Sequence, residues 1–151
     1  MQNETQKIRY TDNGDGTVTD NKTELIWLKN ANCFRRQNWE MAKRSVAKLA
    51  DGQCDLSDGS KAGDWRLPTK DEWEMMVDKR YKEPVLSNAA GTDKWIEGEV
   101  FSGVQTHFYW SSTEYSIGRS WFVLLYDGFV GFDRLTKVFH VWPVRGEKIG
   151  L

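Results

Sequence analysis

Few side chains in this sequence could carry out metal or thiol chemistry. The 151 residues include only two cysteines, Cys33 and Cys54, and two histidines, His107 and His140. A structural zinc site needs four ligands, and these widely spaced residues cannot complete one without carboxylates. We therefore expect no metal site. The cysteines leave two alternatives open, a disulfide or two free buried thiols, and the lack of a visible signal peptide favours the thiols.

No other motif of catalytic chemistry is present. The sequence has no His-Glu-x-x-His, no phosphate-binding loop and no Gly-x-Ser-x-Gly. Residues 13–16, Asn-Gly-Asp-Gly, could suggest calcium, but the spaced oxygen ligands and the distal glutamate of a calcium loop are missing. The same residues are a strong hairpin signal, because each tolerates a positive φ. We predict no catalytic residue and no cofactor.

Bulk properties are those of a globular chain with one domain. Eight Trp, seven Phe and five Tyr can fill a core, and 21 basic against 22 acidic residues leave a net charge of −1. A balanced charge gives no reason to expect nucleic-acid binding, and no apolar run is long enough for a membrane span. The first ten residues are polar and contain no visible signal peptide, although a removed signal would leave the same picture.

The elements that must position any functional residues follow from local signals. Strands are predicted at 9–12, 17–20, 25–28, 121–126, 129–133 and 138–145, with a further strand opening at 109–112. A helix is predicted over 38–50, with Asn38 as its N-cap. A second begins at Thr69, where Glu72 completes a capping box, and runs to about residue 78 or 80. Two helices followed by antiparallel strands predict an α+β fold.

Five motifs follow one another along the chain: Asp-Asn-Gly-Asp-Gly-Thr-Val-Thr-Asp at 12–20, Leu-Ile-Trp at 25–27, Gly-Asp-Trp-Arg-Leu-Pro-Thr at 63–69, Tyr-Trp-Ser-Ser-Thr-Glu at 109–114 and Pro-Val-Arg-Gly at 143–146. In this order they resemble a known family, the domain at the C-terminus of the Legionella collagen-like adhesin. The resemblance spans residues 9–146, which we take as the domain, with 1–8 as a flexible lead-in and 147–151 as a tail. It implies a C-type-lectin-like fold related to the formylglycine-generating, sulfatase-modifying enzymes.

The resemblance to formylglycine-generating enzymes does not extend to their activity. Those enzymes use a pair of cysteines in the C-terminal half to hold copper, and this chain has no cysteine after Cys54. An oxidase that acts through thiolates cannot work without them. We expect the protein not to be an enzyme.

The last strands carry the candidate binding surface. Strand side chains alternate between faces, and the fixed positions of the family pattern match Trp121, Val123, Leu125, Gly128 and Val130, which we place inward. The other face then carries bulky apolar residues, to which Trp142 adds. Burial within the chain and an oligomer contact remain alternatives to a ligand. The predicted contact residues are Tyr115, Ile117, Arg119, Phe122, Leu124, Tyr126, Phe129, Phe132, Arg134, Phe139 and His140.

This surface predicts a binding module, and a protein ranks first among its predicted partners. Aromatic side chains would supply contact area and Arg119 or Arg134 polar anchors. A glycan ranks second, because sulfated polysaccharides, which the adhesin relative binds, would need more clustered Lys and Arg. A trimer-forming fibre end-piece, and so a homo-oligomer, is the structural alternative. Bulky residues between fixed positions also resemble proteins diversified by retroelements. These interpretations favour a cell-surface, secreted or virion-associated location.

Overall fold

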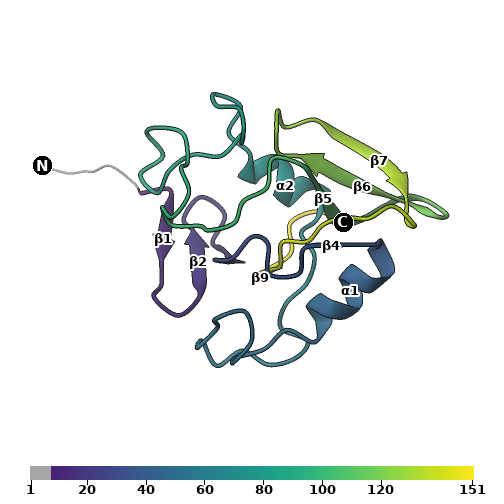
Figure 1. The fold of residues 1–151 in the computed structure, drawn as a ribbon, viewed down its shortest axis with the longest axis horizontal. Coiled ribbons are helices and arrows are strands. Elements are labelled where there is room, and N and C mark those ends of the chain that lie inside the picture. The colour runs from purple at the N-terminus through teal and green to yellow at the C-terminus, as the bar shows by residue number, and fades with distance from the viewer. Residues whose placement is uncertain (1–7) are drawn as a thin grey trace, which may run out of the picture.

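The computed structural model describes residues 8–151, so that the predicted lead-in lies outside the described residues except for Ile8. The chain begins with a meander of three antiparallel strands, β1 (Tyr10–Asp12), β2 (Thr17–Asp20) and β3 (Leu25–Leu28). The predicted turn joins β1 to β2, and Thr17 donates hydrogen bonds to Asp15 through its amide and its hydroxyl. The last strand, β9 (Val144–Arg145), completes this sheet in the order β1-β2-β3-β9 (Figure 1).

A second sheet of five strands follows the order β4-β8-β5-β6-β7. β4 (Arg36–Gln37) and β8 (Phe139–His140) are short, whereas β5 (Phe108–Ser116), β6 (Arg119–Leu124) and β7 (Val130–Arg134) form a long antiparallel section. Two sheets with two helices confirm the predicted α+β class, and the arrangement is consistent with a C-type-lectin-like architecture.

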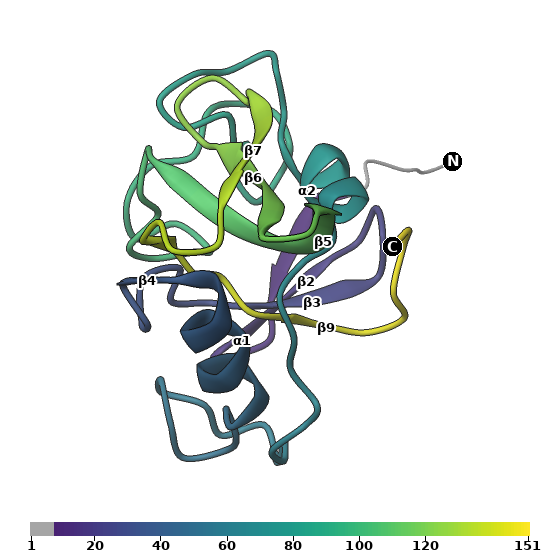
Figure 2. The same ribbon diagram turned by 90° about the vertical axis from the view of Figure 1, so that its right-hand side faces the viewer.

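Both helices start where the sequence predicts and end earlier. α1 (Trp39–Ala47) is capped by Asn38, whose side chain accepts the Met41 amide at 2.9 Å. α2 (Lys70–Met76) starts at the capping box: the Thr69 hydroxyl accepts the Glu72 amide, and the Glu72 carboxylate accepts the Thr69 amide. Figure 2 shows α2 beside β5 and β6, and α1 below β4. No helix of residues 8–151 is long and apolar enough to cross a membrane.

Aromatic rings fill the space between the two sheets. Trp27 of β3 lies 5.2 Å from Trp73 of α2, measured between ring centroids, and 5.4 Å from Trp142. Tyr109 of β5 lies 5.5 Å from Trp73, so rings from both sheets and from α2 form one cluster. Each of the four is almost fully buried, and this cluster ties the sheets together.

The structure corrects the prediction of one closing strand over residues 138–145. That segment forms two short strands, β8 and β9, which belong to different sheets. Pro143 lies between them, where its missing amide cannot support a continuous ladder. Trp142, which we predicted on the outward face, is fully buried in the aromatic cluster and donates its indole N–H to Leu28.

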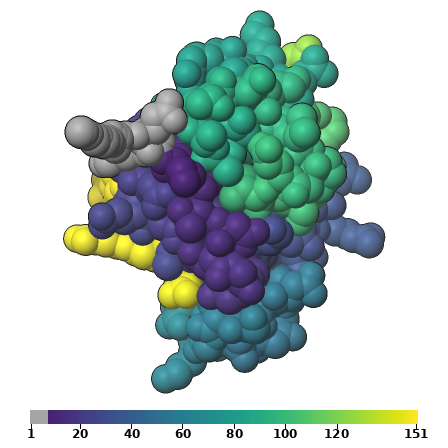
Figure 3. Space-filling model, turned by 90° about the vertical axis from the view of Figure 1, so that its left-hand side faces the viewer, coloured from purple at the N-terminus to yellow at the C-terminus, as the bar shows by residue number. Residues whose placement is uncertain are grey.

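The final residues are tied to the domain. The Ile149 amide donates to Glu72 at 2.9 Å, and the Thr113 hydroxyl donates to the Leu151 carbonyl at 3.1 Å. On another side of the molecule, the segment that links α2 to β5 lies against the β1–β2 hairpin, as the green and purple surfaces of Figure 3 show. There Tyr10 donates its amide to Ala89. The described chain is therefore hydrogen-bonded to the domain near both ends.

Candidate ligand-binding surface

Most of the exposed apolar side chains lie on β5 and β7 and on the segments that connect or follow these strands. Ten large hydrophobic residues are exposed among the described residues, and six of them lie between Tyr115 and Val138. We define the β5–β7 surface by the exposed members of the predicted set: Tyr115, Ile117, Arg119, Tyr126, Phe129, Phe132 and Arg134. Tyr115, Arg119, Phe132 and Arg134 lie within the three strands, whereas Ile117, Tyr126 and Phe129 lie in the connections between them. β6 and β7 pair without interruption, and the pairing of β5 with β6 contains register shifts near Glu114.

One part of the β5–β7 surface is an aromatic stack near the β5–β6 turn. The rings of Tyr115 and Phe132 lie 3.6 Å apart and almost parallel, and Trp121 meets both edge-on. The Lys70 ammonium lies 4.8 Å from the Trp121 ring centroid. Trp121, which we predicted to be inward, is half-buried. Aromatic rings held against one another lose little side-chain freedom on binding.

Two arginines face each other beside this stack. Arg119 and Arg134 are directly paired across β6 and β7, and both are exposed. Neither takes part in the ion pairs found among residues 8–151. Like charges at directly opposite positions destabilise a sheet. Hydrogen-bond acceptors of a bound molecule would relieve the repulsion between these two arginines.

The outward row predicted along β6 is only partly open. Phe122 is 7% exposed, because its ring packs on Phe108 at 4.8 Å and on Phe139 at 5.4 Å. Phe129 covers it from the β6–β7 connection and is itself 56% exposed. Phe129 can lie there because position 131 is glycine: a Cβ atom would come within 2.8 Å of its ring. Neighbouring rings of the sheet itself therefore seal Phe122, which the sequence placed among the exposed contact residues.

Phe139 and His140 were also expected to face a ligand, and both are buried. They belong to β8, an interior strand with β4 on one side and β5 on the other. Leu124, at the end of β6, is half-buried. Of the eleven predicted residues, seven are exposed and three are buried. The exposed ones lie on two faces of the sheet: Arg119, Phe132 and Arg134 share the face of Trp121, whereas Phe129 lies on the opposite face, over Phe122 and Gly131.

A cleft of about 520 Å³ opens at the other end of this sheet. Its polar lining consists of Arg36, Gln105, His107 and His140, and its apolar lining of Phe108, Val138 and Phe139. Arg36, Gln105 and His107 were missed from the sequence. Arg36 is far from the other two in the chain and the three follow no motif, so only the pairing of β4, β8 and β5 reveals that they are neighbours.

In this cleft the pKa of the His140 imidazole is lowered from its ordinary value to about 4. Burial of the imidazole is the main cause, and the positive fields of His107 and Arg36 add to it. Arg36 is paired with His140 across β4 and β8, and the two imidazole rings lie 5.9 Å apart. His140 is therefore neutral at physiological pH.

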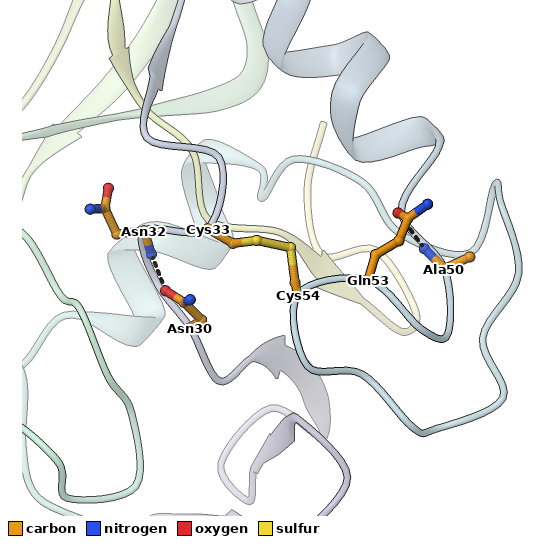
Figure 4. The surroundings of a disulfide bond; sticks show 6 residues. All are labelled: Asn30, Asn32, Cys33, Ala50, Gln53 and Cys54. Carbon is orange, nitrogen blue, oxygen red and sulfur yellow. Dashed lines mark hydrogen bonds between the residues drawn. A yellow bond between two sulfur atoms is a disulfide. The ribbon is translucent and has the colours of Figure 1, made fainter.

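The cysteines form a disulfide, which decides between the two alternatives that the sequence left open. Cys33 and Cys54 are bonded, with their Cα atoms 5.9 Å apart. Figure 4 shows this bond joining the segment after β3 to the loop that follows α1. No free thiol remains among residues 8–151, and no group of three or more His, Cys, Asp or Glu there could hold a metal ion.

The fold and this surface define an α+β domain of C-type-lectin-like architecture with an exposed aromatic sheet. The family model described as "Lcl C-terminal domain" matches residues 16–145, and the chain belongs to that family. This match confirms the resemblance drawn from the five motifs and indicates an adhesin-associated domain. No curated protein matches the chain.

Proposed function

We propose that this domain is a non-catalytic binding module that holds a protein partner on the β5–β7 surface. The observation that carries the proposal is the concentration of exposed large apolar side chains between Tyr115 and Val138. Exposed apolar residues gathered on one part of a monomer usually mark an interaction site, and aromatic residues and Arg are the usual anchors. The Cys33–Cys54 disulfide supports a location outside the reducing cytosol.

A protein partner fits this surface better than a polysaccharide does. The exposed side chains are mainly aromatic and aliphatic, with one pair of arginines at the edge. A sulfated glycan would need a wider cluster of cations to replace its counterions. The rigid sheet lowers the entropic cost of binding, since few side chains must be ordered.

The test compares two matched double variants. Phe129→Ser/Phe132→Ser changes the β5–β7 surface, and Met41→Ser/Ile96→Ser changes exposed apolar residues elsewhere. Peptides selected on the wild-type domain from a displayed random library serve as ligands. We expect the first variant to raise their Kd at least tenfold, and the second to leave it within about twofold. Equal effects of the two variants would refute the proposal.

Two parallel measurements address the other interpretations. A glycan array that detects binding insensitive to Phe129→Ser/Phe132→Ser would favour the polysaccharide-binding domain. Light scattering should give the monomer mass of 17.5 kDa. A measured mass of three chains, which falls to the mass of one chain in Phe129→Ser/Phe132→Ser, would instead favour a fibre-end subunit.

We further propose that a retroelement diversifies this surface. Exposed positions there are interspersed with buried ones such as Ser120, Val123 and Leu125, so the exposed residues could vary without loss of the core. Sequencing the gene's surroundings provides the test. A nearby reverse transcriptase gene and an invariant template repeat of the 3′ coding region are expected, and finding neither would exclude diversification.

A further inference from the structure

The cleft beside β8 is positively charged, and no carboxylate lines it. The Arg36 guanidinium lines it and is absent from the ion pairs found in the described part of the chain. His107 and His140 are the other ionisable groups of the lining. An arginine left without a counterion in a cleft attracts an anion from outside.

None of the side chains that face His140 carries a negative charge. From β4 it faces Arg36, from the segment before β5 it faces His107, and from β5 it faces the Tyr109 ring at 5.3 Å. Its Nδ1 atom lies 3.3 Å from the Asn32 side-chain oxygen. All these neighbours are neutral or cationic at pH 7, because burial raises the pKa of Tyr109 and keeps its phenol protonated.

The rest of the lining is apolar and leads to the β5–β7 surface. Phe108 and Phe139 form one wall and pack on each other at 5.0 Å. Phe108 also contacts Phe122, which Phe129 covers. A ligand on the exposed Phe129 could therefore extend along a continuous row of rings into the cleft.

We infer that this cleft binds the carboxylate of an acidic side chain flanked by apolar residues, presented by the protein partner. The inference rests on the proposed function. Arg36 can hold two carboxylate oxygens at once, and Gln105 and His107 lie beside it. Phe108, Val138 and Phe139 favour an anion with an apolar neighbour over a fully hydrated inorganic ion. The cleft volume of about 520 Å³ is sufficient for such a group.

The test uses two capped tripeptides, Phe-Glu-Phe and Phe-Gln-Phe, titrated into the protein by two-dimensional NMR. Arg36→Gln removes the cation of the cleft, and Arg35→Gln is the matched control, since Arg35 is not part of the lining. We expect the Glu peptide to bind the wild type about tenfold more tightly than the Gln peptide. That preference, about 1.4 kcal/mol, should disappear in Arg36→Gln and persist in Arg35→Gln.

A second measurement in the same titrations follows the pKa of His140. Saturation with the Glu peptide should raise its pKa from about 4, because a bound anion favours the imidazolium. Saturation with the Gln peptide should leave it unchanged. A structural role of Arg36 alone would not produce this difference.

Three results would overturn the inference: equal binding of the two peptides, equal effects of the two arginine variants, or tighter binding of a sulfated disaccharide than of the Glu peptide. These failures can be told apart from failure of the proposed function. If Phe129→Ser/Phe132→Ser still abolishes the binding of selected peptides, only the carboxylate site is wrong.

Discussion

Glu72 is a fully buried carboxylate that holds several parts of the chain together. It receives two hydrogen bonds from Arg66, at 2.8 and 2.7 Å, and one from each of the Thr69 and Ile149 amides. Burial raises the pKa of Glu72, but these hydrogen bonds outweigh it and the net pKa is lowered. The charged form is therefore the stabilising one.

We expect Glu72→Gln to lower the free energy of unfolding by about 2–4 kcal/mol, because it leaves Arg66 without its partner. Wild-type stability should also fall as the pH drops below about 4.5, the ordinary Glu value, through the lowered folded pKa. Urea unfolding across this range measures both effects. The control is Glu74→Gln, on an exposed i,i+4 pair, which should cost less than about 0.5 kcal/mol. An acid limb unchanged in Glu72→Gln would contradict this account.

His140 gives a pH dependence in a different window. Its pKa is lowered from 6.5 to about 4, so that below pH 6.5 the unfolded chain binds a proton that the folded one does not. The stabilisation is complete above pH 6.5 and is lost as the pH falls toward 4, by up to about 1.4 kcal/mol per unit. His140→Gln should flatten the stability curve between these values. Equal slopes in both proteins would show that other groups are responsible.

At the scale of elements, sequence signals worked where the information is local. The capping box of Thr69 and Glu72 and the turn at residues 13–16 need only their own neighbours, and both appear as predicted. Placing Phe122 and Trp142 required knowledge of what covers them. Phe122 is sealed by Phe108, Phe129 and Phe139, and these contacts depend on strand order. The cleft beside β8 was unpredictable for the same reason.

The disulfide constrains the long loop that follows α1. The bonded cysteines are 21 positions apart, so we expect the double variant Cys33→Ser/Cys54→Ser to lose about 2–4 kcal/mol of stability. Urea unfolding measures this loss. Reduction of the wild type with dithiothreitol should reproduce the value. If reduction destabilises the double variant equally, the effect does not come from this bond.

At the scale of the molecule, the residues that stabilise the fold and those that we propose for binding lie in different places. The ring cluster of Trp27, Trp73, Tyr109 and Trp142 joins both sheets and α2 in the interior. The β5–β7 surface lies at one edge of the five-stranded sheet, and its exposed rings contribute little to the buried cluster. Changes at the exposed positions should therefore affect ligands far more than folding.

Phe122 and Phe129 test this separation directly, because their rings are in contact and differ in exposure. We expect Phe122→Ala to cost about 3–4 kcal/mol of stability, since it opens a cavity between Phe108 and Phe139. Phe129→Ala should cost less than about 1 kcal/mol and yet weaken the selected peptides at least tenfold. Thermal unfolding and peptide titration of both variants provide the comparison. Strong destabilisation by Phe129→Ala, with unchanged peptide affinity, would mean that Phe129 only covers the core.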